Sequence, residues 1–296
     1  MNNKSRTGNL SLCELTVEDG ALVTNTGAPF DAESYSRFKY GDAVIAFEYG
    51  VALAKKFIAA HATMFATRAS EIDLVVVTSP YKFIPKGASA IVRGFLDYTN
   101  AYLWRAGKQA ISEIKIHKAN MFEGDYGTFS EEERRRLTAG NKLHVAESYL
   151  YGKAVVVIDD VRITGAHERN LAEFLGGIGV SAMHFLYVAS VDANYAQRDP
   201  QIESRMNHTW MDSFAKLSEI VNGEKFAMNA RVCKYVLSQG STPAFAQFVA
   251  SEGTPFLKEL LTSAIGDGYA LMPMYRDACE FIAGELDHRL RAKVPQ

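Results

Sequence analysis

The sequence predicts an α/β protein in which a parallel sheet is flanked by helices and followed by a mostly helical C-terminal extension. Residues 74–78 (LVVVT) and 154–158 (AVVVI) are continuous β-branched runs, typical of strands buried on both faces. Helical segments alternate with such strands up to about residue 191, an order that builds a parallel sheet with helices on both faces. After about Asp192 no further strong strand is indicated.

The predicted elements of the sheet region follow one another from residue 42. A helix is expected to begin near Asp42, because five apolar residues then follow at helical spacing: Val44, Phe47, Val51, Ala54 and Ile58. The strand at 74–78 precedes a loop and a helix over 88–100, and a second strand is plausible at 114–118. The strand at 154–158 precedes a helix over 168–175, which glycines at 176, 177 and 179 end before a strand over 183–191.

The predicted organisation has three segments: an N-terminal arm (1–40), the α/β core (41–192) and the helical extension (193–296). The arm is expected to be irregular, because turn residues such as Gly20, Gly27 and Pro29 punctuate it. In the extension, Thr242-Pro243 and Thr254-Pro255 are expected N-cap and first-turn pairs of two helices, and Gly266 is expected to end the second.

Composition and charge narrow the functional classes. The 296 residues are 48% hydrophobic and 22% charged, and the formal net charge of -2 gives no electrostatic reason to expect nucleic acid or a membrane surface as partner. No apolar run approaches the ~18 residues that span a bilayer, and the first residues lack the apolar region of a signal peptide. Three widely spaced cysteines indicate neither a disulfide framework nor a zinc site. We therefore expect a protein of the reducing cytoplasm.

Residues 155–167 (VVVIDDVRITGAH) carry the functional prediction. Asp159 and Asp160 follow a buried strand, and ionised carboxylates only accept hydrogen bonds, which suits the hydroxyl groups of a sugar. The loop then leads into a helix, where free backbone N–H groups and the helix dipole favour a phosphate. Thr164 adds a hydroxyl, and Gly165 allows close approach of the backbone. Together these features predict a site for a pentose phosphate.

This segment resembles the phosphoribosyl pyrophosphate (PRPP) motif of type I phosphoribosyltransferases, which implies a Rossmann-like core. The resemblance makes Asp159 and Asp160 the catalytic acids and assigns the 5'-phosphate to Arg162, Ile163, Thr164, Gly165, Ala166 and His167. Two positions depart from the motif, since Ile163 and His167 stand where hydroxyl residues are usual. The alternative is a Rossmann-like strand that happens to end in two aspartates.

Further segments support the resemblance, which covers roughly residues 40–192. The loop after the first strand resembles a pyrophosphate-binding loop, and the residues implied there are Ser79, Tyr81, Lys82 and Lys86. Lys118, at the end of the next strand, is added to them. Residues 129–141 resemble the mobile loop of the ComF-like branch, which implies that Arg134, Arg135 or Arg136 closes over pyrophosphate. Solvated surface lysines and arginines are the alternative. Residues 35–42 mix aromatic and cationic side chains. They suit an acceptor-binding hood or a packed N-terminal arm, and the packed arm is the favoured interpretation.

The resemblance implies an enzyme that moves a 5-phosphoribosyl group from PRPP to an unknown acceptor, a base or base-like nitrogen compound, and releases pyrophosphate. The layout is similar to ComF-like phosphoribosyltransferases of tellurium-resistance stress operons. Mg²⁺ is the implied cofactor, held mainly by substrate and water near the two aspartates rather than by dedicated protein ligands. A homodimer is a family-level expectation. The alternative is a non-catalytic sensor of PRPP or a nucleotide on the same fold. A sugar-phosphate hydrolase is less favoured, because no Gly-x-Ser-x-Gly segment is present.

Overall fold

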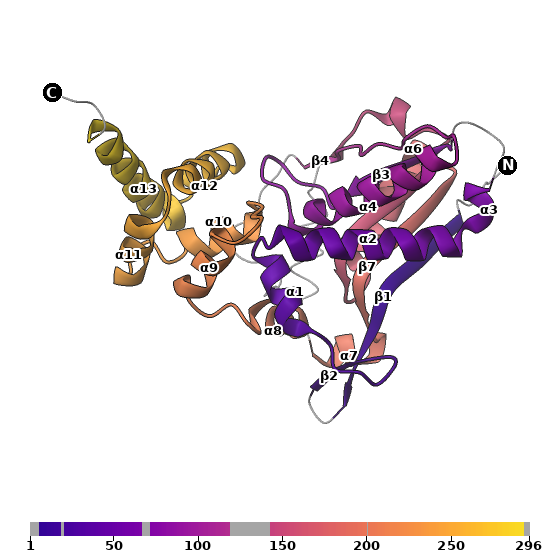
Figure 1. Ribbon diagram of the computed structural model, residues 1–296, viewed down its shortest axis with the longest axis horizontal. Coiled ribbons are helices and arrows are strands. Elements are labelled where there is room, and N and C mark those ends of the chain that lie inside the picture. Colours follow the sequence, from indigo (N-terminus) through magenta and orange to yellow (C-terminus); the bar gives the residue numbers. More distant parts are fainter. Residues whose placement is uncertain (1–5, 19–20, 67–71, 119–142, 200, 293–296) are drawn as a thin grey trace.

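The computed structural model describes residues 6–18, 21–66, 72–118, 143–199 and 201–292 (Figure 1). Its centre is a five-stranded sheet of order β2-β1-β7-β6-β3. Four strands run parallel, and the edge strand β2 (Ala21–Thr24) is antiparallel to its neighbour. The parallel strands are β1 (Arg6–Glu18), β3 (Leu74–Thr78), β6 (Ala154–Arg162) and β7 (Ala182–Val191). The predicted fold class is confirmed.

Helices cover both faces of the sheet. On one face α2 (Ala43–Ala60) and α4 (Gly87–Arg105) pack in front of the strands in Figure 1, over a core that includes Val76 of β3. On the other face α6 (Ala166–Ile178) packs through two leucines, Leu171 and Leu175, against alternate strand residues. Because successive strand side chains point to opposite faces, both sets must be apolar. This explains the unbroken apolar runs in β3 and β6.

The helices α2 and α4 approach each other unusually closely. A Cβ atom at Gly50 would lie 2.1 Å from the backbone oxygen of Ile91, and one at Gly94 would lie 2.1 Å from that of Phe47. The predicted start of α2 is confirmed, since Asp42 caps it and accepts from the backbone of residues 44 and 45. The predicted apolar stripe is right in its second half, where Ala54 and Ile58 are buried, and wrong in its first half, where Phe47 is 37% exposed and the buried stripe passes through Ala46 and Gly50.

The expectation of irregular structure before residue 40 is wrong. β1 is a 13-residue strand that pairs in parallel with β7 along most of its length. Leu10 and Leu12 alternate with polar Asn9 and Ser11, which is a strand pattern, but the nearby turn residues obscured it. The helix α1 (Ala32–Lys39) follows, capped by the side chain of Asp31.

The strand expected at 114–118 forms only at its end. Val76 of β3 donates its N–H to the carbonyl of Ser112 at 3.0 Å and accepts from the N–H of Ile114 at 2.8 Å, so this segment forms a parallel bridge with the edge of the sheet at Glu113. It then turns away, and β4 (His117–Lys118) pairs antiparallel with β5 (Leu143–His144) in a separate two-stranded sheet.

After β7 the described chain is helical, as predicted. The helices are α7 (Ala193–Arg198), α8 (Ile202–His208), α9 (Phe214–Val221), α10 (Ala230–Leu237), α11 (Pro243–Ser251), α12 (Thr254–Asp267) and α13 (Pro273–Arg291). Thr242 caps α11 as expected, but Gly253 rather than Thr254 is the N-cap of α12, and Gly268 rather than Gly266 ends it. Three short elements complete the described helices: α3 (Ala62–Phe65) and 3₁₀ turns at Glu147–Tyr149 and Tyr269–Leu271.

The C-terminal helices pack on the α/β core although they gather at one end of the molecule (Figure 1). Their hydrophobic cluster includes Tyr40 and Ile84 from the core. The buried Asp267 carboxylate accepts from the backbone N–H groups of Phe83 and Ile84 at 2.8 and 3.1 Å. The boundaries at residues 40 and 192 stay predictions.

Within the described ranges no helix is both long and apolar enough to cross a membrane. All three cysteines are free, with Cys233 and Cys279 buried and Cys13 half-buried.

Candidate functional site

A cavity of about 1090 Å³ lies beyond the carboxyl ends of β3 and β6, between them and the C-terminal helices. This is where parallel α/β sheets bind ligands. Every site residue predicted from the sequence that falls within the described chain lines it: Ser79, Tyr81, Lys82, Lys86, Lys118, Asp159, Asp160, Arg162, Ile163, Thr164, Gly165, Ala166 and His167. The arginines at 134, 135 and 136 lie outside the described residues.

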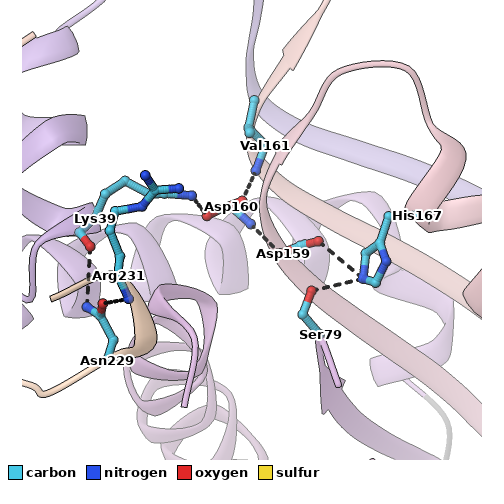
Figure 2. A network of polar contacts seen from close by, with 8 residues as sticks. All are labelled: Lys39, Ser79, Asp159, Asp160, Val161, His167, Asn229 and Arg231. Atoms are coloured by element: carbon cyan, nitrogen blue, oxygen red, sulfur yellow. Dashed lines mark hydrogen bonds and ion pairs between the residues drawn. The ribbon is translucent and has the colours of Figure 1, made fainter. Parts of the chain in front are cut away.

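The two adjacent carboxylates lie at the end of β6 and are held by backbone groups (Figure 2). Asp159 accepts from the N–H of Asp160 at 3.0 Å, and Asp160 accepts from the N–H of Val161 at 2.7 Å. Burial, together with the neighbouring charge of Asp160, raises the pKa of Asp159 to about 6. At neutral pH both carboxylates are therefore mainly ionised acceptors.

Lys39 is the main partner of Asp160 and was missed in the sequence. It lies at the end of α1, and its ammonium group contacts the Asp160 carboxylate (Figure 2). The two side chains are only 8% and 15% exposed. Burial acts to raise the pKa of Asp160, but the charge and hydrogen bond of Lys39 outweigh it, so the pKa is lowered. Asp160 is thus the firmly ionised member of the pair.

The segment 35–42 is packed in the core at some positions and lines the cavity at others. Tyr35 and Phe38 are buried in the core, whereas Lys39 and Tyr40 line the cavity. The mixed aromatic and cationic composition was the available signal for Lys39. Its pairing with Asp160 was not readable, because 121 residues separate the two in the chain.

The loop before α6 has the geometry of an anion site. Gly165 occupies the N-cap position with φ +71°, in the left-handed region that favours glycine. A Cβ atom there would also meet the guanidinium of Arg162 at 3.0 Å. Ile163 is 8% exposed and belongs to the hydrophobic core. The side chain at position 163 therefore provides no hydrogen-bond donor to an anion. The donors that the loop can provide are its backbone N–H groups and the hydroxyl of Thr164.

Glu168 organises the base of this loop. Its carboxylate accepts from Arg162 Nε at 2.8 Å and from the Tyr187 hydroxyl at 2.9 Å. Asn9 of β1 donates to both of its oxygens at 3.0 Å. Arg162 is thereby fixed beside the loop by three elements of the core.

His167 faces Ser79 and Asp159 through a single nitrogen (Figure 2). Its Nε2 lies 3.1 Å from Ser79 Oγ and 3.7 Å from Asp159 Oδ2. A Ser-His-Asp relay would need the serine and the aspartate on opposite ring nitrogens, so this arrangement is not a hydrolase triad. Burial and the charges of Lys86 and Lys118 lower the pKa of His167 to about 3, which keeps the imidazole neutral at pH 7.

The predicted lysines divide into two environments. Lys82 Nζ donates to the carbonyl of Asp267 at 3.3 Å, at the end of α12, and its own carbonyl accepts from Lys115. Lys86 and Lys118 lie near His167, whose pKa both lower. Burial and the charges of Lys86 and Lys234 lower the pKa of Lys118 itself to about 7. The cavity therefore has a strongly cationic region beside the carboxylates.

The neighbouring Tyr81 is fixed by backbone pairing with the segment before β4. Its N–H donates to the carbonyl of Ile116 at 3.4 Å, and its carbonyl accepts from the N–H of Lys118 at 3.1 Å. Lys115 Nζ lies 4.1 Å from the centre of its ring. This pairing holds Lys118 next to the loop after β3.

Comparison with known families agrees with this geometry. The chain belongs to the ComF-like phosphoribosyltransferase family, whose sequence model matches residues 17–282. The predicted resemblance is confirmed, and the match extends beyond 40–192 to include most of the C-terminal helices. No curated protein sequence matches the chain.

Solved structures similar to the chain are distant. A hypoxanthine phosphoribosyltransferase from Staphylococcus aureus is 14% identical, with 49% of this chain and 64% of that chain covered and a TM-score of 0.30. The match thus spans less than two thirds of that protein. A hypoxanthine-guanine phosphoribosyltransferase from Bacillus anthracis is 15% identical, with 51% and 71% covered and a TM-score of 0.31. At TM-scores this low, the similarity does not extend to the positions of individual site residues.

Proposed function

We propose that the protein transfers a 5-phosphoribosyl group from PRPP to a nitrogen atom of a base or base-like acceptor and releases pyrophosphate. One observation carries the proposal. The paired carboxylates of β6, the phosphate loop before α6 and the lysines of the β3 loop all line one cavity of about 1090 Å³. That volume lies at the upper end of typical ligand sites, so it is ample for PRPP with an acceptor.

The chemistry of the cavity wall suggests how PRPP would lie. The backbone N–H groups of residues 162–167 suit the 5'-phosphate. Asp159 and Asp160 suit the ribose hydroxyls as acceptors. Lys86 and Lys118 then lie where the diphosphate would extend, beside Ser79 and His167. The acceptor would occupy the aromatic part of the cavity, where Tyr40 and Tyr235 have ring centroids 5.4 Å apart.

In this arrangement the residues favour cleavage of the bond between the anomeric carbon and pyrophosphate. Positive charge develops on that carbon in the transition state, and the ionised Asp160 lies ready to stabilise it. The lysines stabilise the negative charge that accumulates on the leaving pyrophosphate. The electron pair of the broken C–O bond leaves with pyrophosphate, the lone pair of the acceptor nitrogen forms the new bond to the carbon, and the proton of that nitrogen passes to the released pyrophosphate or to water.

Magnesium is the proposed cofactor, and the residues present fit a metal held mainly by substrate. No group of three or more His, Cys, Asp or Glu side chains able to hold a metal occurs in the described part of the chain. Asp159 and Asp160 supply hard oxygen atoms near the ribose, and Mg²⁺ prefers such sites when substrate phosphates and water complete its shell. When bound, it would neutralise charge on the diphosphate.

Calorimetric titration of PRPP tests the proposal, with and without Mg²⁺ and with the variants Asp159→Asn and Asp160→Asn. We expect magnesium-dependent binding that weakens about tenfold or more in each variant, because a ribose hydroxyl loses a charged acceptor. Asp277→Asn, an exposed acid on α13, is the matched control. Unchanged affinity and turnover in both site variants would exclude the assigned roles.

A PRPP or nucleotide sensor is the second candidate, and one observation favours it. The core position of Ile163 and the placement of His167 leave the loop without the two hydroxyl side chains of the family motif. Pyrophosphate release, measured while a panel of nitrogen bases is supplied with PRPP, separates the two functions. PRPP binding without release supports the sensor, whereas release that depends on one base supports the transferase.

A further inference from the structure

The helix α10 places its polar face in the cavity rather than in open solvent. Four residues at helical spacing, Arg231, Lys234, Tyr235 and Ser238, all line the cavity. The opposite face is buried in the C-terminal cluster through Val232, Cys233, Val236 and Leu237. The amphipathic pattern of α10 therefore serves two purposes: one face anchors the helix, and the other contributes cations to the site.

The start of α10 is attached to the chain segments that carry the site lysines. Asn229 caps the helix through its side-chain oxygen and donates to the carbonyl of Lys39 at 3.3 Å (Figure 2). The N–H of Ala230 donates to the carbonyl of Pro85 at 3.1 Å, next to Lys86. These bonds fix the register of α10 relative to both Lys39 and Lys86.

The two cations of α10 reach different parts of the site. Arg231 lies beside Lys39 and Asp160 in Figure 2, and its charge is among those that act to lower the pKa of Asp160. Lys234 is one turn further along, with its Nζ 5.6 Å from the ring centre of the buried Tyr269. There its charge, with that of Lys86, acts against protonation of Lys118, whereas the carboxylate of Asp267 acts in favour of it. Lys86, Lys118 and Lys234 thus form one cationic cluster.

We propose that Lys234 of the C-terminal helical region is a pyrophosphate-binding residue, which joins Lys86 and Lys118 around the diphosphate. The like charges of these ammonium groups repel one another in a partly buried site, and a diphosphate bound between them would offset that repulsion. The inference rests on the proposed function for the identity of the anion. It assigns the C-terminal helices a direct part in the site, in contrast to a role in packing alone.

The test measures binding of inorganic pyrophosphate and of ribose 5-phosphate to the full-length protein in magnesium buffer. For Lys234→Gln we expect pyrophosphate affinity to fall about tenfold, the effect of one charge-assisted contact, with ribose 5-phosphate affinity and Tm unchanged. Lys234→Arg should restore most of the affinity, which a purely structural role would not predict. Lys258→Gln, an exposed lysine on α12 outside the cavity lining, is the matched control.

The outcomes separate this inference from the proposed function. Equal pyrophosphate affinity in the wild type and in Lys234→Gln overturns the role of Lys234 and leaves the transferase proposal intact. Loss confined to pyrophosphate supports the role, even if no acceptor gives turnover and the transferase proposal fails. An equal loss for ribose 5-phosphate, or a lowered Tm that Lys234→Arg does not restore, overturns a specific diphosphate contact.

Discussion

The ion pair between Lys39 and Asp160 joins α1 to the end of β6, and Lys39→Met tests its contribution. Both side chains are almost enclosed, at 8% and 15% exposed, so the variant leaves a buried carboxylate without its ammonium partner. Breaking such a pair typically costs about 3–5 kcal/mol. Because the charge of Arg231 also acts on Asp160, we expect a loss near the lower limit, about 3 kcal/mol in the free energy of unfolding.

The loss should depend on pH in a defined direction. In the wild type the lowered pKa of Asp160 contributes stability above its ordinary value of 3.8, and this contribution disappears as the pH falls through the folded-state pKa. Without Lys39, burial beside Asp159 is expected to raise the pKa of Asp160. The variant should therefore lose most free energy of unfolding at neutral pH, where the carboxylate is ionised, and less at low pH, where the carboxyl is protonated. The difference between the two proteins should therefore be largest near neutral pH and should narrow in acid.

Urea unfolding of the wild type, Lys39→Met, Asp160→Asn and the double variant measures these quantities. The double variant should recover most of the stability lost in Lys39→Met, because it removes the unpaired charge. Lys153→Met is a control, since Lys153 and Asp73 form a pair 3.4 Å apart whose side chains are 35% and 80% exposed. It should cost under about 1 kcal/mol. A loss of under about 1 kcal/mol in Lys39→Met would refute the reasoning, and so would a double variant no more stable than Lys39→Met.

Two further predictions concern packing and ligand charge. Gly50→Ala should destabilise the protein by about 1–3 kcal/mol in urea unfolding, because the new methyl group meets the backbone of α4, whereas Gly177→Ala, with open space around it, should be neutral or slightly stabilising. Comparable losses in both would contradict the close packing of α2 on α4. Pyrophosphate affinity measured by calorimetry should fall as the pH rises through about 7, where Lys118 loses its proton, and Lys118→Arg should flatten this dependence. A pH profile identical in the two proteins would exclude Lys118 as its origin.

Local patterns in the sequence were sufficient for the central strands and for the phosphate loop. The apolar runs of β3 and β6 are continuous because both faces of the sheet are covered, and such runs are recognisable without knowledge of the partners. The order of strand, two carboxylates, loop and helix is likewise contained in thirteen consecutive letters, residues 155–167. These features gave both the fold class and the location of the candidate site.

Features that depend on distant contacts were not readable in the same way. The strand β1 was obscured because its alternating leucines are weak evidence next to several turn residues, and its pairing with β7 joins segments over 170 residues apart, such as Gly8 and His184. The first half of the α2 stripe was misplaced because the buried positions there include a glycine, which a search for apolar side chains does not count. The sequence around Lys39 and around Lys234 contains no recognisable motif, and only the fold brings these two lysines to the cavity.

The family match to residue 282 and the position of α10 together change how the C-terminal helices are understood. Their buried cluster includes Tyr40, which follows Lys39 in the chain, and Ile84, which lies two positions before Lys86. Packing of the helices therefore sets the positions of cations in the cavity, in addition to stabilising the chain. Because Asp267 holds the backbone of Phe83 and Ile84, a change at the end of α12 would be transmitted to the loop after β3. The α/β core and the C-terminal helices consequently act as two walls of one site, and neither wall alone carries all the groups that face the proposed diphosphate.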